Sequence, residues 1–201
     1  MDQYEAELKS ALKEGEIVRW KGSVAPYRLF DADNKKSTGI IWLISIGIAA
    51  VLSILYTVYV LTAQGATFQP FVYFLTIGFP FLGFIDPVRD QKHIAGQLLA
   101  VTNQRVMIFH KSTPNENKSI GLGFGQIDKA RIEEIESGIN RLRLGSATFK
   151  SKGLKLRRDA MLGGKDDDDR VIGLVFYQLK GKDCADICMI LKENSVAIEK
   201  G

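Results

Sequence analysis

The chain has 201 residues, of which 46% are hydrophobic and 25% are charged, and it carries a formal net charge of +4. This length allows one ordinary domain with a small attachment, and the hydrophobic content is normal for a globular protein. The sequence contains no internal repeat, which excludes a repeat array. Charge is distributed unevenly, because residues 37–85 contain no charged side chain.

The first segment, residues 1–36, is predicted to be an N-terminal arm. Leu8, Ala11 and Leu12 recur at helical spacing, and Gly15 ends this short amphipathic pattern. The residues that follow lack helical spacing, and Pro26 favours an extended or turning path. We therefore expect one short helix and then an extended approach to the next segment.

Residues 37–88 are predicted to form a transmembrane helical hairpin, with spans at about 39–62 and 67–85. The first span is long enough to cross roughly 30 Å of hydrocarbon at about 1.5 Å per residue. The second contains Pro80, which neighbouring helices can accommodate within a membrane. The alternative is a pair of buried helices in a soluble domain, where so long an uncharged run is rare.

Cations flank the two apolar stretches at their outer ends. Arg28, Lys35 and Lys36 precede the first stretch, Arg89 and Lys92 follow the second, and the connecting loop is uncharged. By the positive-inside rule, both termini are predicted to face the cytoplasm, in the inner or plasma membrane of a cell. A cleaved signal peptide is not expected, because a polar segment precedes the first apolar stretch.

From residue 97 onward the pattern changes to short strands. Segments 97–102 and 105–111 flank Asn103-Gln104, and asparagine tolerates the positive φ of a tight hairpin turn. Further strands are predicted at 119–124, 127–135, 139–145, 147–152, 154–158 and 171–177. Helical spacing then links Cys184, Ile187, Cys188, Leu191 and Ile198, after a helix cap predicted at Asp183. We expect antiparallel strands followed by one helix that covers a curved sheet, an α+β or mainly β domain.

Four stretches together resemble membrane-flanked bacterial PH-like domain proteins. They are "LKEGEIVRWKG", "LLAVTNQRVMIF", "IGLGFGQIDKARIEEI" and "VIGLVFYQL", the last running into the terminal helix. The most specific is "AVTNQRVMIF", which is close to the Leu-Thr-Asn-x-Arg hairpin of that family. The resemblance implies a PH-like split barrel of about seven antiparallel strands closed by a C-terminal helix, in residues 97–201, and implies no catalytic activity.

One departure from PH domains that bind phosphoinositides concerns the first hairpin loop. Those domains carry a basic signature there, whereas this loop is only Asn103-Gln104 with Arg105 beside it. Phosphoinositide-specific binding is therefore not predicted.

Other motifs favour ordinary structural roles. The glycines of "GLGFG" (121–125) lack the third glycine of a dinucleotide fingerprint, and the run Asp166 to Asp169 lacks the interleaved ligands and the glycine of a calcium loop. Cys184 and Cys188 have no nearby histidine to complete a zinc site. No motif of a hydrolase, metalloprotease or nucleotide-binding loop occurs, so no enzyme activity, cofactor or metal is predicted.

One basic pattern stands out from this background. Arg141 and Arg143 alternate with leucines, Lys155 and Arg157 do the same, and alternation puts basic side chains on one face of a strand. With two lysines between them, six cations are predicted on one outer sheet face: Arg141, Arg143, Lys150, Lys152, Lys155 and Arg157. Such a face is either simply solvated or binds anionic lipid head groups or an acidic partner. Nucleic acid is not expected, since no aromatic residues interleave the cations.

The sequence thus predicts a non-enzymatic, membrane-anchored adaptor or assembly module at the cytoplasmic face, which acts through protein contacts, with anionic lipid or a second copy as further candidates. The alternative is an accessory subunit of a transporter or channel complex. The two spans contain no ionisable residue, which argues against an ion-coupled carrier on its own.

Overall fold

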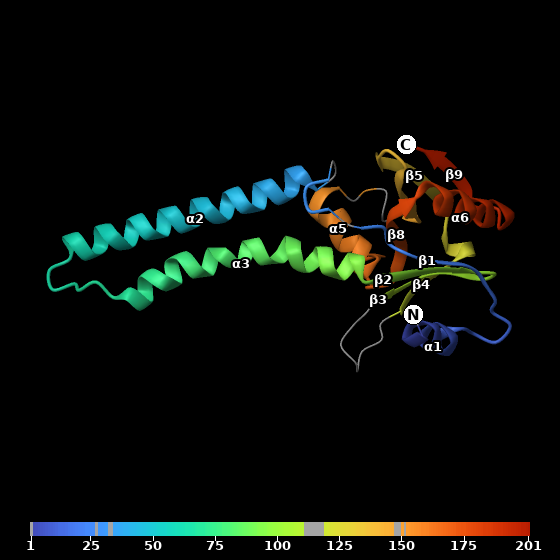
Figure 1. Cartoon of the computed structure of the whole chain (residues 1–201), viewed down its shortest axis with the longest axis horizontal. Coiled ribbons are helices and arrows are strands. Elements are labelled where there is room, and N and C mark those ends of the chain that lie inside the picture. Colours follow the sequence, from blue (N-terminus) through green and yellow to red (C-terminus); the bar gives the residue numbers. More distant parts are fainter. Residues whose placement is uncertain (1, 27, 32–33, 111–118, 147–149, 151) are drawn as a thin grey trace.

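The computed structural model describes residues 2–26, 28–31, 34–110, 119–146, 150 and 152–201. Two long helices project together from a β-rich domain that contains both chain termini (Figure 1). The long helices are α2 (Lys35–Thr62) and α3 (Pro70–Ala95). The β-rich domain (hereafter the β domain) is therefore built from chain segments on both sides of the helical hairpin.

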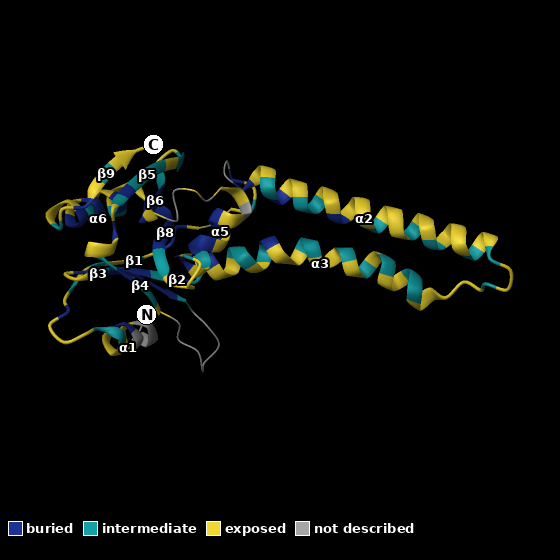
Figure 2. Ribbon diagram, turned by 180° about the vertical axis from the view of Figure 1, so that it is seen from behind, coloured by how far each residue is buried: buried dark blue, intermediate teal, exposed yellow. Residues whose placement is uncertain are grey.

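Both hairpin helices are long and apolar enough to span a membrane. Only 11% of the most apolar window of each helix is buried, and Figure 2 shows exposed residues along most of their length. Exposed apolar surface of this extent is typical of a contact with lipid or with another protein. Helix α3 continues beyond the predicted end at residue 85, so its charged last turns reach the β domain.

The first sheet has four antiparallel strands in the order β1-β2-β3-β4. They are β1 (Val18–Ser23), β2 (Gln97–Thr102), β3 (Arg105–His110) and β4 (Ser119–Gly123). Strands β1 and β2 pair along their length although the whole helical hairpin lies between them in the chain. The predicted strand at 97–102 is confirmed, whereas β1 was expected only as an extended approach.

Side chains alternate between the two faces of this sheet, and both faces are covered. One face contributes Leu99, Val101 and Ile108 to the main core, which lies between the two sheets. The opposite face packs on α1 (Asp2–Ala11), where Leu8 meets Met107 in a small second cluster. The short N-terminal helix predicted from the amphipathic pattern is confirmed.

The second sheet has five strands in the order β7-β8-β6-β5-β9. They are β5 (Lys129–Glu136), β6 (Ile139–Leu144), β7 (Gly164–Lys165), β8 (Val171–Lys180) and β9 (Ala197–Lys200). A short 3-10 turn, η1 (Phe124–Gln126), joins the two sheets, and helices α5 (Gly153–Leu162) and α6 (Gly181–Glu193) pack on the core. The described strands form two sheets and no closed barrel.

Two sequence predictions differ from this structure, and a third lies largely outside the described residues. The predicted strand at 154–158 is wrong, because these residues belong to α5, where Leu156 and Ala160 are buried one turn apart. Ile198 lies in β9, which follows α6 and pairs parallel to β5. The predicted order, in which one helix follows the strands and ends the domain, is therefore incomplete. Of the strand predicted at 147–152, residues 147–149 and 151 lie outside the described residues, as does Lys111.

The Thr-Asn-Gln-Arg corner between β2 and β3 holds the N-terminal segment in place. The Arg105 guanidinium donates to both carboxylate oxygens of Glu16, at 2.8 and 2.9 Å, and the Glu16 side chain is fully buried. Asn103 accepts a hydrogen bond from the Ile17 amide at 2.9 Å and donates to the Gly15 carbonyl at 3.2 Å. These hydrogen bonds and this ion pair thus join the corner to the residues that lead into β1.

Burial opposes ionisation of Glu16, but hydrogen bonds from Arg105, the Lys13 amide and Thr102 outweigh it. They lower the pKa of Glu16 from 4.5 to about 2. A lowered pKa stabilises the fold fully above pH 4.5, and this stabilisation is lost as the pH falls toward 2.

We predict that Glu16→Gln lowers the free energy of unfolding by about 3 kcal/mol at neutral pH, because it leaves the largely buried Arg105 without its anion. The difference from the native chain should shrink between pH 4.5 and pH 2. Denaturation of the full chain in mild detergent, followed by circular dichroism, measures both effects.

The exposed neighbour Glu14 supplies the matched control. Glu14→Gln should change stability by less than about 0.5 kcal/mol. Equal losses of stability for the two variants would show that the Glu16–Arg105 ion pair makes no specific contribution to the stability of the fold.

Candidate functional site

Buried polar groups lie at the hairpin base, where residues 24–26, 28–31 and 34, the end of α3 and helix α5 meet the β domain (Figure 1). Two links join the hairpin to the β domain, one at α2 and the other at α3. Both links involve charged groups that are buried or largely buried.

The link to α2 is a hydrogen-bond network around Asp31, which is 3% exposed. The Asp31 carboxylate accepts from the Asn34 amide at 2.7 Å and from the Gln178 side chain at 2.8 Å. The Asn34 side chain in turn lies 3.3 Å from the Tyr177 hydroxyl, to which it donates. The residues immediately before α2 are thereby bonded to strand β8.

The link to α3 is an ion pair between Asp90 and Arg157 on α5, with 3.1 Å between Oδ2 and Nε. The Arg157 side chain is 3% exposed and Asp90 is 16% exposed. Nearby, the Gln97 side chain donates to the Ala160 carbonyl at 2.8 Å. Helix α5 therefore fixes the end of α3 where it runs into β2.

The six cations predicted on one sheet face do not share that face. Arg141 and Arg143 lie on β6 but are almost fully buried, and both donate to Glu133, Arg141 at 2.9 Å. The Arg141 guanidinium also lies 5.7 Å from the centre of the Tyr177 ring. Although burial acts in the opposite sense, the two arginines lower the pKa of Glu133. Because β6 lies between β5 and β8, side chains of both neighbours, Glu133 and Tyr177, contact these arginines and help to cover them.

The other four predicted cations lie on or next to α5. Arg157 is buried in the Asp90 pair, whereas Lys155, Lys150 and Lys152 are exposed. The prediction of one common sheet face is therefore wrong, since helical geometry turns Lys155 and Arg157 in different directions. Three of the six, Lys150, Lys152 and Lys155, remain on the surface.

Sequence reasoning missed one residue of the exposed group, Arg158. With it, the exposed cations at the hairpin base form a set that we call the basic collar. Its members are Arg28, Lys35, Lys36, Arg89, Lys92, Lys150, Lys152, Lys155 and Arg158. Recognising 153–162 as a helix would have placed Lys155 and Arg158 on one side of it, three residues apart.

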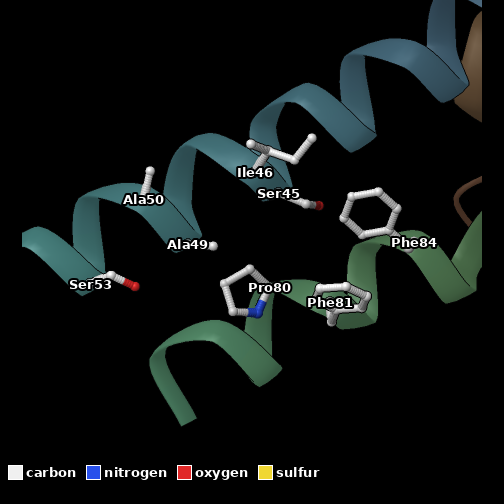
Figure 3. Close-up of a pocket in the computed structure, with 8 residues that line it drawn as sticks. All are labelled: Ser45, Ile46, Ala49, Ala50, Ser53, Pro80, Phe81 and Phe84. Atoms are coloured by element: carbon white, nitrogen blue, oxygen red, sulfur yellow. The ribbon is translucent and has the colours of Figure 1, made fainter. Parts of the chain in front are cut away.

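Two hollows adjoin these elements. A hollow of about 460 Å³ between α2 and α3 is lined by small side chains of α2, with Ala49 and Ser53 facing Pro80 (Figure 3). A second hollow, of about 560 Å³, lies beside α5 and is lined by three cations, two aspartates, a leucine and a glycine: Lys155, Arg158, Lys165, Asp159, Asp169, Leu162 and Gly163. The first is apolar and the second is charged, so they suit different partners.

No group of three or more His, Cys, Asp or Glu residues that could hold a metal occurs among the described residues. Cys184 and Cys188 are buried one turn apart on α6. The hydrogen bond between them, together with burial, raises the pKa of the Cys184 thiol. These cysteines belong to the main core.

Comparison with family models, with characterised proteins and with solved structures finds no match for this chain. Inferences about function therefore depend on the geometry of the chain itself.

We predict that Arg157→Gln lowers the free energy of unfolding by about 3 kcal/mol, because it leaves the partly buried Asp90 carboxylate without this cationic partner. The double variant with Asp90→Asn should lose less than the two single losses combined, since each single change removes the same ion pair. Thermal unfolding of the four proteins in detergent gives this coupling energy.

Arg158→Gln, one position further along α5 and exposed, is the control, with an expected change below about 0.5 kcal/mol. Strict additivity of the Asp90 and Arg157 changes would contradict a specific link between α3 and α5.

Proposed function

We propose that this protein is a non-enzymatic, membrane-anchored adaptor or assembly module that holds a PH-like domain at the cytoplasmic face of the inner or plasma membrane. The observation that carries this proposal is the hairpin base. Two exposed apolar helices are joined to one β domain by the Asp31 network and the Asp90–Arg157 pair. Such a joint keeps the surface of the β domain at a fixed position relative to the helices.

The element order supports the PH-like part of the proposal. Four antiparallel strands are followed by an antiparallel run of β5, β6 and β8 and then by α6. The resemblance noted in the sequence implies about seven antiparallel strands closed by a C-terminal helix. Helix α1, the hairpin between β1 and β2, helix α5, the two-residue strand β7 and the parallel strand β9 are additions to it.

Two features support cytoplasmic termini. The basic collar lies at the end of the hairpin that joins the β domain, and the described loop at the other end has no charged residue. Trp42 lies near that base between Phe30 and Phe84, with ring centroids 5.1 and 5.2 Å away. Aromatic rings of this kind favour the boundary between hydrocarbon and head groups.

We predict that a membrane-impermeant thiol reagent added to intact cells labels Ala66→Cys, in the loop of the hairpin, and leaves Lys182→Cys, on α6, unlabelled. The uncharged loop should lie outside and the β domain inside. Permeabilised cells should give labelling of both.

The native chain is the control, because its two cysteines are buried. Labelling of Lys182→Cys alone in intact cells would reverse the proposed orientation.

A second candidate, an accessory subunit of a transporter or channel complex, is favoured by the apolar hollow in Figure 3. Small side chains let a neighbouring membrane helix approach closely, and Ala49 and Ser53 lie one turn apart along this hollow. Ser45 continues the row toward Gly83, where an added methyl group would collide with the Ser45 hydroxyl.

Purification of the full chain in mild detergent separates the two candidates. We expect assemblies of the chain with itself for the adaptor, and stoichiometric recovery of a multi-spanning protein for the accessory subunit. Filling the hollow with Ala49→Leu should abolish the second outcome but leave the first intact, while Val51→Leu, on an exposed position, is the control. Recovery of a monomer without companions would contradict both candidates.

A further inference from the structure

Helix α5 has one buried side and one exposed side that the fold leaves uncovered. Leu156 and Ala160 enter the core, while Lys155, Arg158 and Leu162 recur at spacings of three and four on the exposed side. Leu162, 49% exposed, is the one large apolar residue of this group. An exposed stripe with two cations and one leucine is amphipathic in the manner of helices that lie at a membrane surface.

The position of α5 puts this stripe beside the membrane anchor. The helix is paired to α3 through Arg157 and lies next to the start of α2 in Figure 1. Phe30, which directly precedes the buried Asp31 network, is a second exposed apolar side chain at the same base, with 52% exposure. Both apolar residues lie outside the two spans.

Three cations (Lys155, Arg158 and Lys165) and two acids (Asp159 and Asp169) line the hollow beside the stripe. Of the acids near it, Asp159 is buried, Asp169 pairs with Lys165 at 2.7 Å, and Asp86 pairs with Arg89 at 3.1 Å. The remaining surface of the hairpin base carries the basic collar. A surface with this charge is complementary to anionic lipid head groups.

We propose that α5 is a membrane-surface helix: Lys155 and Arg158 contact the head groups of anionic lipids in the bilayer that holds the hairpin, and Leu162 enters the interface. This inference rests on the proposed anchoring and adds the ligand class and the orientation of the β domain. Because the hairpin already holds α5 at the bilayer, docking loses little translational freedom, and a few weak contacts suffice.

The test uses the full chain in lipid nanodiscs and measures hydrogen exchange of the α5 backbone amides. We expect slower exchange of residues 155–162 in discs containing phosphatidylglycerol than in discs of phosphatidylcholine alone. The difference should fade as salt rises, because the Debye length falls from about 30 Å at 0.01 M to about 8 Å at 0.15 M.

Lys155→Gln with Arg158→Gln should remove this protection. Each basic residue at an anionic surface contributes about fivefold to binding, so the pair accounts for about 25-fold. The variant should then exchange alike in both kinds of disc. Lys182→Gln with Lys192→Gln, two exposed cations on α6 away from the hairpin, is the matched control and should keep the native difference.

Equal α5 exchange of the native chain in both discs would overturn the inference, as would loss of protection in the α6 control. Failure of the anchoring itself has a separate signature in the same data. Amides of α2 and α3 would then exchange freely in both discs. If the amides of α2 and α3 are protected but those of α5 exchange equally in both discs, only the docking of α5 is contradicted.

Discussion

The pairing of β1 with β2 is the constraint on which the rest of the structure depends. Ser23 and Leu98 are partners across this ladder, although the complete helical hairpin lies between them. The chain must therefore leave the sheet, form two long apolar helices and return in register. Loop-closure entropy opposes such a long insertion, but its cost grows slowly with length, and the contact between α2 and α3 brings the two ends together.

The arginines of the chain divide into two groups with different physical roles. Arg105, Arg143 and Arg157 are largely or fully buried beside carboxylates, where loss of one partner is costly but the intact pair mainly fixes a geometry. The exposed collar residues, such as Arg158 and Lys155, contribute little to the fold and are free to meet an outside surface. Of these pairs, Arg157–Asp90 joins the hairpin to the β domain, and this places the exposed group beside the base of the hairpin.

The sequence predicts the elements whose patterns are local. An uncharged stretch identifies the hairpin, and alternation around Asn103 identifies β2 and β3. Around Lys155 the alternation covers only a few residues, too few to separate a strand from the helix that the burial of Leu156 and Ala160 reveals. The burial of Arg141 depends on its sheet neighbours, which no periodicity in its own strand encodes.

Insertion of the hairpin in a bilayer is tested most directly by spin labels on Val51→Cys and Phe79→Cys, at exposed positions within α2 and α3. In full-chain proteoliposomes, both labels should be accessible to molecular oxygen and shielded from a water-soluble nickel chelate. Equal accessibility to the nickel chelate at these positions and at Lys182→Cys on α6 would contradict a membrane-spanning hairpin.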